Sequence, residues 1–125
     1  PLLHGKAERL AERRTEVSKK VSDILPKTEI LAQLAEEASE LAQAALKLRR
    51  ALDGTNPTPK SVAECEANLT EEIADVTNAI SALLDSWFGE SIESENEFWD
   101  AEREIEGAKY KRWISRLEAK ENKNG

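Results

Sequence analysis

The sequence predicts an all-α fold, and three observations support that prediction. Ala, Leu, Glu, Lys and Arg are the common residues of a 125-residue chain with only five glycines and four prolines, and this is a helical composition. Apolar residues recur at helical spacing, and no segment alternates as a strand would. Long helices joined by short loops pack antiparallel. We therefore expect one domain, residues 1–125 with a core over 28–117. It should be an antiparallel bundle of about four helices completed by oligomerisation.

The first two helices are separated by a proline. A strongly charged segment, 6–24, has apolar residues at helical positions and should end before Pro26, which cannot continue a helix. A second helix is expected over 28–52, and Asp53–Gly54 has the composition of its C-terminal end.

The last two helices follow the breaker-rich segment 54–60. Ser61-Val-Ala-Glu64 has the pattern of a capping box and should begin a third helix, which Gly89 should end. A fourth helix should begin near Ser91 or Ser94 and run to about Ala119, with Gly107 as a weak point and a frayed tail over 120–125.

The charge and the cysteine content limit the function classes. The formal net charge is −7, which argues against a nucleic acid polymer as partner, because proteins that bind one usually present a basic surface. A small phosphorylated ligand fits if a divalent cation inverts the local field. Cys65 is the one cysteine, so we expect a reducing, cytoplasmic location. No segment has the length of a membrane span or a signal peptide, so no membrane partner is expected.

An acidic motif occurs twice in the sequence. The segments 34–41 and 69–76 both follow L-x-E-E-x-x-(E/D)-(L/V), 35 residues apart. On a helical wheel, Glu37 falls at the edge of an apolar stripe and Glu40 lies one turn on. Glu72 and Asp75 take the matching places on the third helix. Expected stripe members are Ile30, Leu34, Ala38, Leu41, Ala45, Leu48 and Leu52, then Leu69, Ile73, Val76, Ile80, Leu83 and Trp87.

Antiparallel packing would bring the two acidic pairs together. Four carboxylates in a partly buried site raise one another's pKa unless a cation binds. Only oxygen ligands are present, which favours Mg²⁺, with Mn²⁺ as a substitute. A single EE-x-x-E segment is more often a solvated helix face, but two matched copies bordering apolar stripes make a metal site an equal alternative. Glu36 and Glu71 point away from the stripes.

The acidic pattern resembles the EExxE…ExxD signature of MazG-like nucleoside triphosphate pyrophosphohydrolases, and the likeness spans about 28–117. The ending Lys109-Tyr-Lys-Arg112-Trp-Ile-Ser-Arg116-Leu is similar to that of short, phage-type members. The 31 residues between Glu40 and Glu72 make a slightly long spacer, and the segment before Thr28 matches nothing in the family.

This resemblance implies Mg²⁺-dependent hydrolysis of a nucleoside triphosphate to a monophosphate and pyrophosphate. It implies a homodimer or homotetramer with helices of two subunits forming the site. The expected metal ligands are Glu37, Glu40, Glu72 and Asp75. Glu37 is the expected base that activates water, and Glu36 is a supporting or alternate base.

The remaining candidates lie near the C-terminus. Lys109, Arg112 and Arg116 follow an i, i+3, i+7 spacing and could clamp the β- and γ-phosphates, although a basic face near a helix C-terminus is common. Tyr110, Trp113 and Leu117 form a stripe with Trp99 that suggests core or subunit interface. Asn78 is expected on the face opposite the acidic pair.

Two rival hypotheses remain at this stage. The first is a non-catalytic helical interaction module, for which removal of a buried charge should be neutral or stabilising. The second is a di-iron carboxylate bundle. It needs Glu-x-x-His motifs, but the only histidine is His4.

Overall fold

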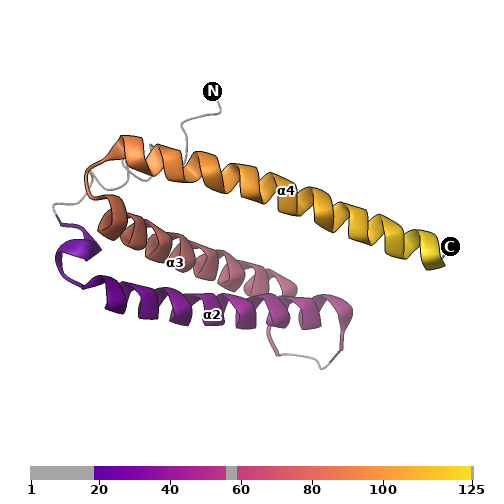
Figure 1. Ribbon diagram of the computed structural model, residues 1–125. Coiled ribbons are helices and arrows are strands. Elements are labelled where there is room, and N and C mark those ends of the chain that lie inside the picture. The colour runs from indigo at the N-terminus through magenta and orange to yellow at the C-terminus, as the bar shows by residue number, and fades with distance from the viewer. Residues whose placement is uncertain (1–18, 56–58, 125) are drawn as a thin grey trace. The chain divides into compact units, whose positions relative to one another are not determined.

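The computed structural model describes residues 19–55 and 59–124, and every regular element in these ranges is helical (Figure 1). In chain order they are η1 (Val21–Asp23, a 3₁₀ turn), α2 (Lys27–Asp53), α3 (Val62–Phe88) and α4 (Ile92–Asn124). The all-α prediction is therefore confirmed for the described residues. None of these helices has the length and apolarity needed to cross a membrane. The chain divides into two compact units, one spanning Val17–Gly89 and the other including Glu90–Gly125.

The residues just before α2 form a turn, not the end of an α-helix. An α-helix was expected up to Ile24, and most of that expected helix lies outside the described residues. Lys20 donates its backbone N–H to Oδ2 of Asp23 at 2.9 Å, and the Asp23 N–H returns to the Lys20 carbonyl at 3.0 Å. Pro26 disfavours helical backbone at the residue before it. The chain therefore closes one 3₁₀ turn and then enters α2.

The helix ends agree with the local signals in the sequence. α2 ends at Gly54, which adopts φ +73°, and α3 ends at Gly89, which adopts φ +59°. Both are backbone conformations that favour glycine. At the start of α3, the Glu64 N–H donates to Oγ of Ser61 and the Ser61 N–H donates to Oε1 of Glu64, each at 3.1 Å. The predicted capping box is thus confirmed.

α2 and α3 form an antiparallel pair. Ile30, near the start of α2, packs against Ala82 and Leu83, near the end of α3, and Figure 1 shows the two helices side by side. η1 also contacts α3. The predicted antiparallel packing is confirmed for these two helices.

The interface between α2 and α3 follows a seven-residue repeat, and we call its buried and half-buried residues the seam. Seam residues alternate at spacings of three and four, as in coiled coils. Those of α2 are Ile30, Leu34, Glu37, Leu41, Ala44, Leu48 and Ala51; those of α3 are Val62, Cys65, Leu69, Glu72, Val76, Ala79, Leu83 and Ser86.

The apolar stripe expected from a straight helical wheel is therefore partly wrong. Ala38, Ala45 and Leu52 of α2 are exposed, as are Ile73 and Trp87 of α3. A stripe with a 3.6-residue period drifts by about 20° per heptad from a seam with a 3.5-residue period. The expected stripe is therefore wider than the seam: Leu34, Leu41 and Leu48 lie in the seam, whereas the exposed members lie beside it.

α4 is longer than expected. Ser91 precedes its first residue and accepts the Ser94 N–H on its hydroxyl at 3.2 Å, in agreement with the predicted start. The helix continues through Gly107 and includes 120–124, so the expectation of a frayed tail is wrong. Lys120 and Lys123 lie near this C-terminal end, where positive charge is favoured by the helix dipole.

Candidate metal centre

The antiparallel pair brings the two acidic motifs together. Glu37 and Glu40 of α2 and Glu72 and Asp75 of α3 each present one carboxylate oxygen, and these oxygens all lie within 4.8 Å of one another. We call these four residues the acidic cluster. Carboxylates predicted to meet from the sequence pattern do meet in the structure, and the cluster could hold a metal ion.

The register of the seam explains how the cluster forms. Ile30 is level with Ala82 and Leu83, so an antiparallel partner places Glu37 level with Asp75 and Glu40 level with Glu72. Glu37 and Glu72 occupy seam positions and are half-buried, whereas Glu40 and Asp75 flank the seam and are exposed. The sequence had placed Glu37 and Glu72 at the border of the buried face, but they lie within it.

The cluster concentrates four carboxylates, two of them half-buried. Oε2 of Glu37 and Oε2 of Glu72 are buried, and neither accepts a hydrogen bond from the described residues. The negative charge of Glu37, then desolvation, then the charge of Glu72 raise the pKa of Glu40 above its usual value. Arg49 pairs with Asp53 and Arg103 with Asp100, so neither of these ion pairs involves the cluster. A cation would therefore be attracted to this position.

The outer glutamate of each motif lies away from the cluster. Glu36 and Glu71 are exposed, as expected, and Glu36 acts on the cluster only through space, by adding to the repulsion that raises the pKa of Glu40. The structure does not place Glu36 among the groups that could bind a cation.

A pocket of about 190 Å³ adjoins the cluster. Its walls are mainly apolar, and Glu37 and Asp75 belong to both the pocket and the cluster. The other lining residues are Val21, Leu25, Ile30, Gln33, Asn78, Ala79 and Ala82. The expectation that Asn78 faces away from the acidic residues is wrong, because it lines this pocket three residues after Asp75.

Sequence reasoning also missed Gln33. Its Nε2 donates a hydrogen bond to Oε1 of Glu37 at 2.7 Å, and it lines the same pocket. A polar side chain four residues before Glu37 shares its face, so the spacing itself was an available signal.

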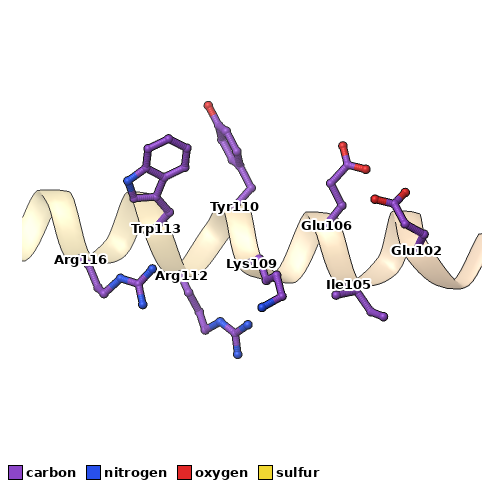
Figure 2. Close-up of a pocket in the computed structure, with 8 residues that line it drawn as sticks. All are labelled: Glu102, Ile105, Glu106, Lys109, Tyr110, Arg112, Trp113 and Arg116. Carbon is purple, nitrogen blue, oxygen red and sulfur yellow. The ribbon is translucent and has the colours of Figure 1, made fainter. Parts of the chain in front are cut away.

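The predicted phosphate ligands lie on α4, in the other compact unit. Lys109, Arg112 and Arg116 project from one side of the helix, whereas Tyr110 and Trp113 project from the other (Figure 2). These side chains border a shallow hollow whose lining residues all belong to α4. The phosphate clamp stays a prediction.

The aromatic stripe of α4 is not part of a core among the described residues. Tyr110 and Trp113 are 60% and 55% exposed, and their rings meet edge to face with centroids 6.1 Å apart. Leu117 is 49% exposed, whereas Trp99 is half-buried. The expected core role is therefore not met by the exposed part of the stripe, and the subunit-interface role stays a prediction.

Comparison with protein-family models, with curated protein sequences and with solved structures finds no match to this chain. The acidic cluster and the adjoining pocket are therefore the features from which a function can be inferred.

Proposed function

We propose that this protein is a Mg²⁺-dependent nucleotide pyrophosphohydrolase that hydrolyses a nucleoside triphosphate to a monophosphate and pyrophosphate. One observation supports this most directly. Four carboxylates from two helices converge within 4.8 Å, and two of their oxygens are buried without a hydrogen-bond donor from the described residues.

The donor set of the cluster suits Mg²⁺. Every donor is a carboxylate oxygen, which hard divalent cations prefer, and Mn²⁺ accepts the same ligands. The ligands would be Glu37, Glu40, Glu72 and Asp75. A bound cation would neutralise charge on the phosphate oxygens and lower the pKa of a coordinated water molecule.

Glu37 is the best candidate for the general base. It is half-buried, Gln33 holds its Oε1 at 2.7 Å, and its Oε2 remains without a donor from the described residues. A carboxylate in that condition can accept a proton from water as the water oxygen bonds to the α-phosphorus. The bond from that phosphorus to the bridging oxygen then breaks, and pyrophosphate leaves.

The pocket beside the cluster suits the uncharged part of a nucleotide. Ligand pockets combine apolar walls with a few polar groups that fix orientation, and here Gln33 and Asn78 supply amides among apolar side chains. Arg112 and Arg116, with Lys109, would bind the β- and γ-phosphates, because guanidinium groups bind phosphate oxygens with two hydrogen bonds. Homodimers or homotetramers would bring α4 of one subunit to a site that it completes.

A helical interaction module is the second candidate, and the exposed apolar residues favour it. Tyr110, Trp113 and Leu117 of α4, and Ile73 of α3, are each about half exposed. Such side chains mark surfaces that bind partners. This candidate gives no reason for two carboxylates to occupy a mainly apolar seam.

The deciding experiment is a hydrolysis assay with a panel of ribo- and deoxyribonucleoside triphosphates, in Mg²⁺ or in EDTA. Pyrophosphate and orthophosphate should be detected separately. We expect Mg²⁺-dependent pyrophosphate and an equal amount of monophosphate. Orthophosphate would place the broken bond elsewhere. No product from any substrate would favour the interaction module.

Two variants sharpen that assay. Glu72→Gln removes a cluster ligand, and Glu71→Gln makes the same change at the exposed neighbouring position. Turnover should be lost in the first variant and kept in the second. Equal activity in both would show that hydrolysis arises elsewhere.

A further inference from the structure

Gln33 is the described residue whose amide reaches the acidic cluster. Its Nε2 donates to Oε1 of Glu37 at 2.7 Å, from one turn earlier on α2. The contact is short for an N–H···O bond, as expected when the acceptor is charged.

This hydrogen bond makes the two oxygens of Glu37 different. Oε1 is held by Gln33, whereas Oε2 is buried and accepts nothing from the described residues. A glutamate side chain has three rotatable bonds, so holding one oxygen restricts where the other can lie. The restricted carboxylate is one of the two that occupy the seam.

The position of Gln33 also connects the cluster with the pocket. Gln33, Glu37 and Asp75 line the pocket together, and an amide has a second N–H and a carbonyl oxygen beyond the group that it uses. A residue in this position can orient Glu37 without itself binding the cation.

We propose that Gln33 is a positioning residue that orients Glu37 for cation binding. The inference rests on the metal site of the proposed function and adds a residue that the acidic motif does not contain. Groups that hydrogen-bond to metal ligands typically contribute about 10- to 100-fold to metal affinity. Gln33 should therefore set the strength of the site although it is not a ligand.

The test is a calorimetric titration of the full chain with Mg²⁺, repeated with Mn²⁺, at pH 8. Gln33→Leu removes the donor, and we expect Mg²⁺ affinity to fall about 10-fold or more. Gln43→Leu is the matched control, since Gln43 is also an exposed glutamine of α2, and it should bind like the wild type. Gln33→His keeps a neutral N–H donor at this pH and should restore most of the affinity.

A thermal melt in EDTA separates positioning from folding. Gln33→Leu should melt at the wild-type temperature when no cation is present. A melting temperature of Gln33→Leu that is low enough to account for its weaker Mg²⁺ binding would overturn the proposal in favour of a purely structural role. Unchanged Mg²⁺ affinity in Gln33→Leu would also overturn it. Loss of binding in Glu72→Gln alongside normal binding in Gln33→Leu would keep the metal site and reject only the role of Gln33. Failure of the wild type to bind either cation would reject the metal site itself.

Discussion

Replacing Glu72 with glutamine should have opposite effects on stability with and without Mg²⁺. Glu72 is a half-buried seam residue with one buried oxygen that lacks a donor among the described residues. Gln is nearly isosteric with Glu, so the change removes the charge and leaves the packing. The variant therefore isolates the electrostatic cost of the cluster.

The magnitude follows from the geometry of the cluster. The carboxylate oxygens lie within 4.8 Å of one another, and two unit charges at that limit repel by about 1 kcal/mol in a water-like medium and by about 3.5 kcal/mol at an effective dielectric constant of 20. Because half of the cluster is exposed, the lower value applies. Without metal, Glu72→Gln should thus raise the free energy of unfolding by about 1 kcal/mol.

With Mg²⁺ bound, the wild type should instead be more stable than Glu72→Gln. At a concentration about 100 times its dissociation constant, a ligand specific for the folded state stabilises it by about 2.7 kcal/mol. If Glu72→Gln no longer binds, it should be less stable than the wild type by about 1.7 kcal/mol under those conditions, the difference between these two effects. Urea unfolding followed by far-UV circular dichroism, in EDTA and in Mg²⁺, measures both values.

Glu71→Gln is the control for this experiment, since it removes the same charge from an exposed position on the same helix. It should gain as much stability from Mg²⁺ as the wild type does. An equal Mg²⁺-induced gain in Glu72→Gln, or a loss of stability in EDTA, would refute the reasoning.

Three further predictions concern pH, capping and assembly. Because Glu37 and its neighbours raise the pKa of Glu40 above 4.5, the folded state holds that proton more tightly than the unfolded chain. Metal-free protein should therefore lose stability as pH rises from 4.5 through the folded pKa of Glu40. Thermal melts in EDTA at a series of pH values measure this, and the melting temperature of Glu40→Gln should depend less on pH. A wild-type melting temperature that rises over this range would contradict the prediction. Ser61→Ala should lower the free energy of unfolding by about 1 kcal/mol in urea titrations, and Ser39→Ala, within α2, should not. Trp113→Glu should reduce the mass measured by light scattering if α4 forms a subunit interface, and equal masses would argue against that role.

Local signals predicted the helices well because they act over a few residues. Ser61 with Glu64, and the glycines at 54 and 89, determine where helices begin and end through bonds to their own neighbours. Residues 21–24, the described end of the first expected helix, were misjudged because helix-forming composition there competes with a proline and with the hydrogen bond from the Lys20 N–H to the Asp23 carboxylate. The tail over 120–124 was misjudged because favourable charge at a helix end offsets the tendency to fray.

The acidic residues could be predicted from the sequence, but their surroundings could not. Two i, i+3 acidic pairs beside the apolar stripes of two amphipathic helices determine which carboxylates can meet, whichever residues of each helix face the partner. Which residues face the partner depends on how the two helices coil around each other. For this reason Glu37 and Glu72, expected at the border of the buried face, lie in the seam. Asn78 was misassigned because it lines a pocket together with Val21 and Leu25 from the segment before α2, a tertiary arrangement that no single-helix pattern contains.

Because Glu37 and Glu72 lie in the seam, the register of the α2–α3 pair determines whether the acidic cluster forms. Apolar seam residues flank Glu37 on α2 and Glu72 on α3, namely Leu34, Leu41, Leu69 and Val76. Burial of these apolar side chains opposes a change of register, and a shift of one helical turn, about 5.4 Å, would move the two acidic pairs out of level. The apolar seam therefore opposes the repulsion between carboxylates and holds them together before any cation binds. If the proposed Mg²⁺ site is correct, Glu37 and Glu72 should lose little conformational freedom on binding the cation, and this pre-organisation should favour affinity.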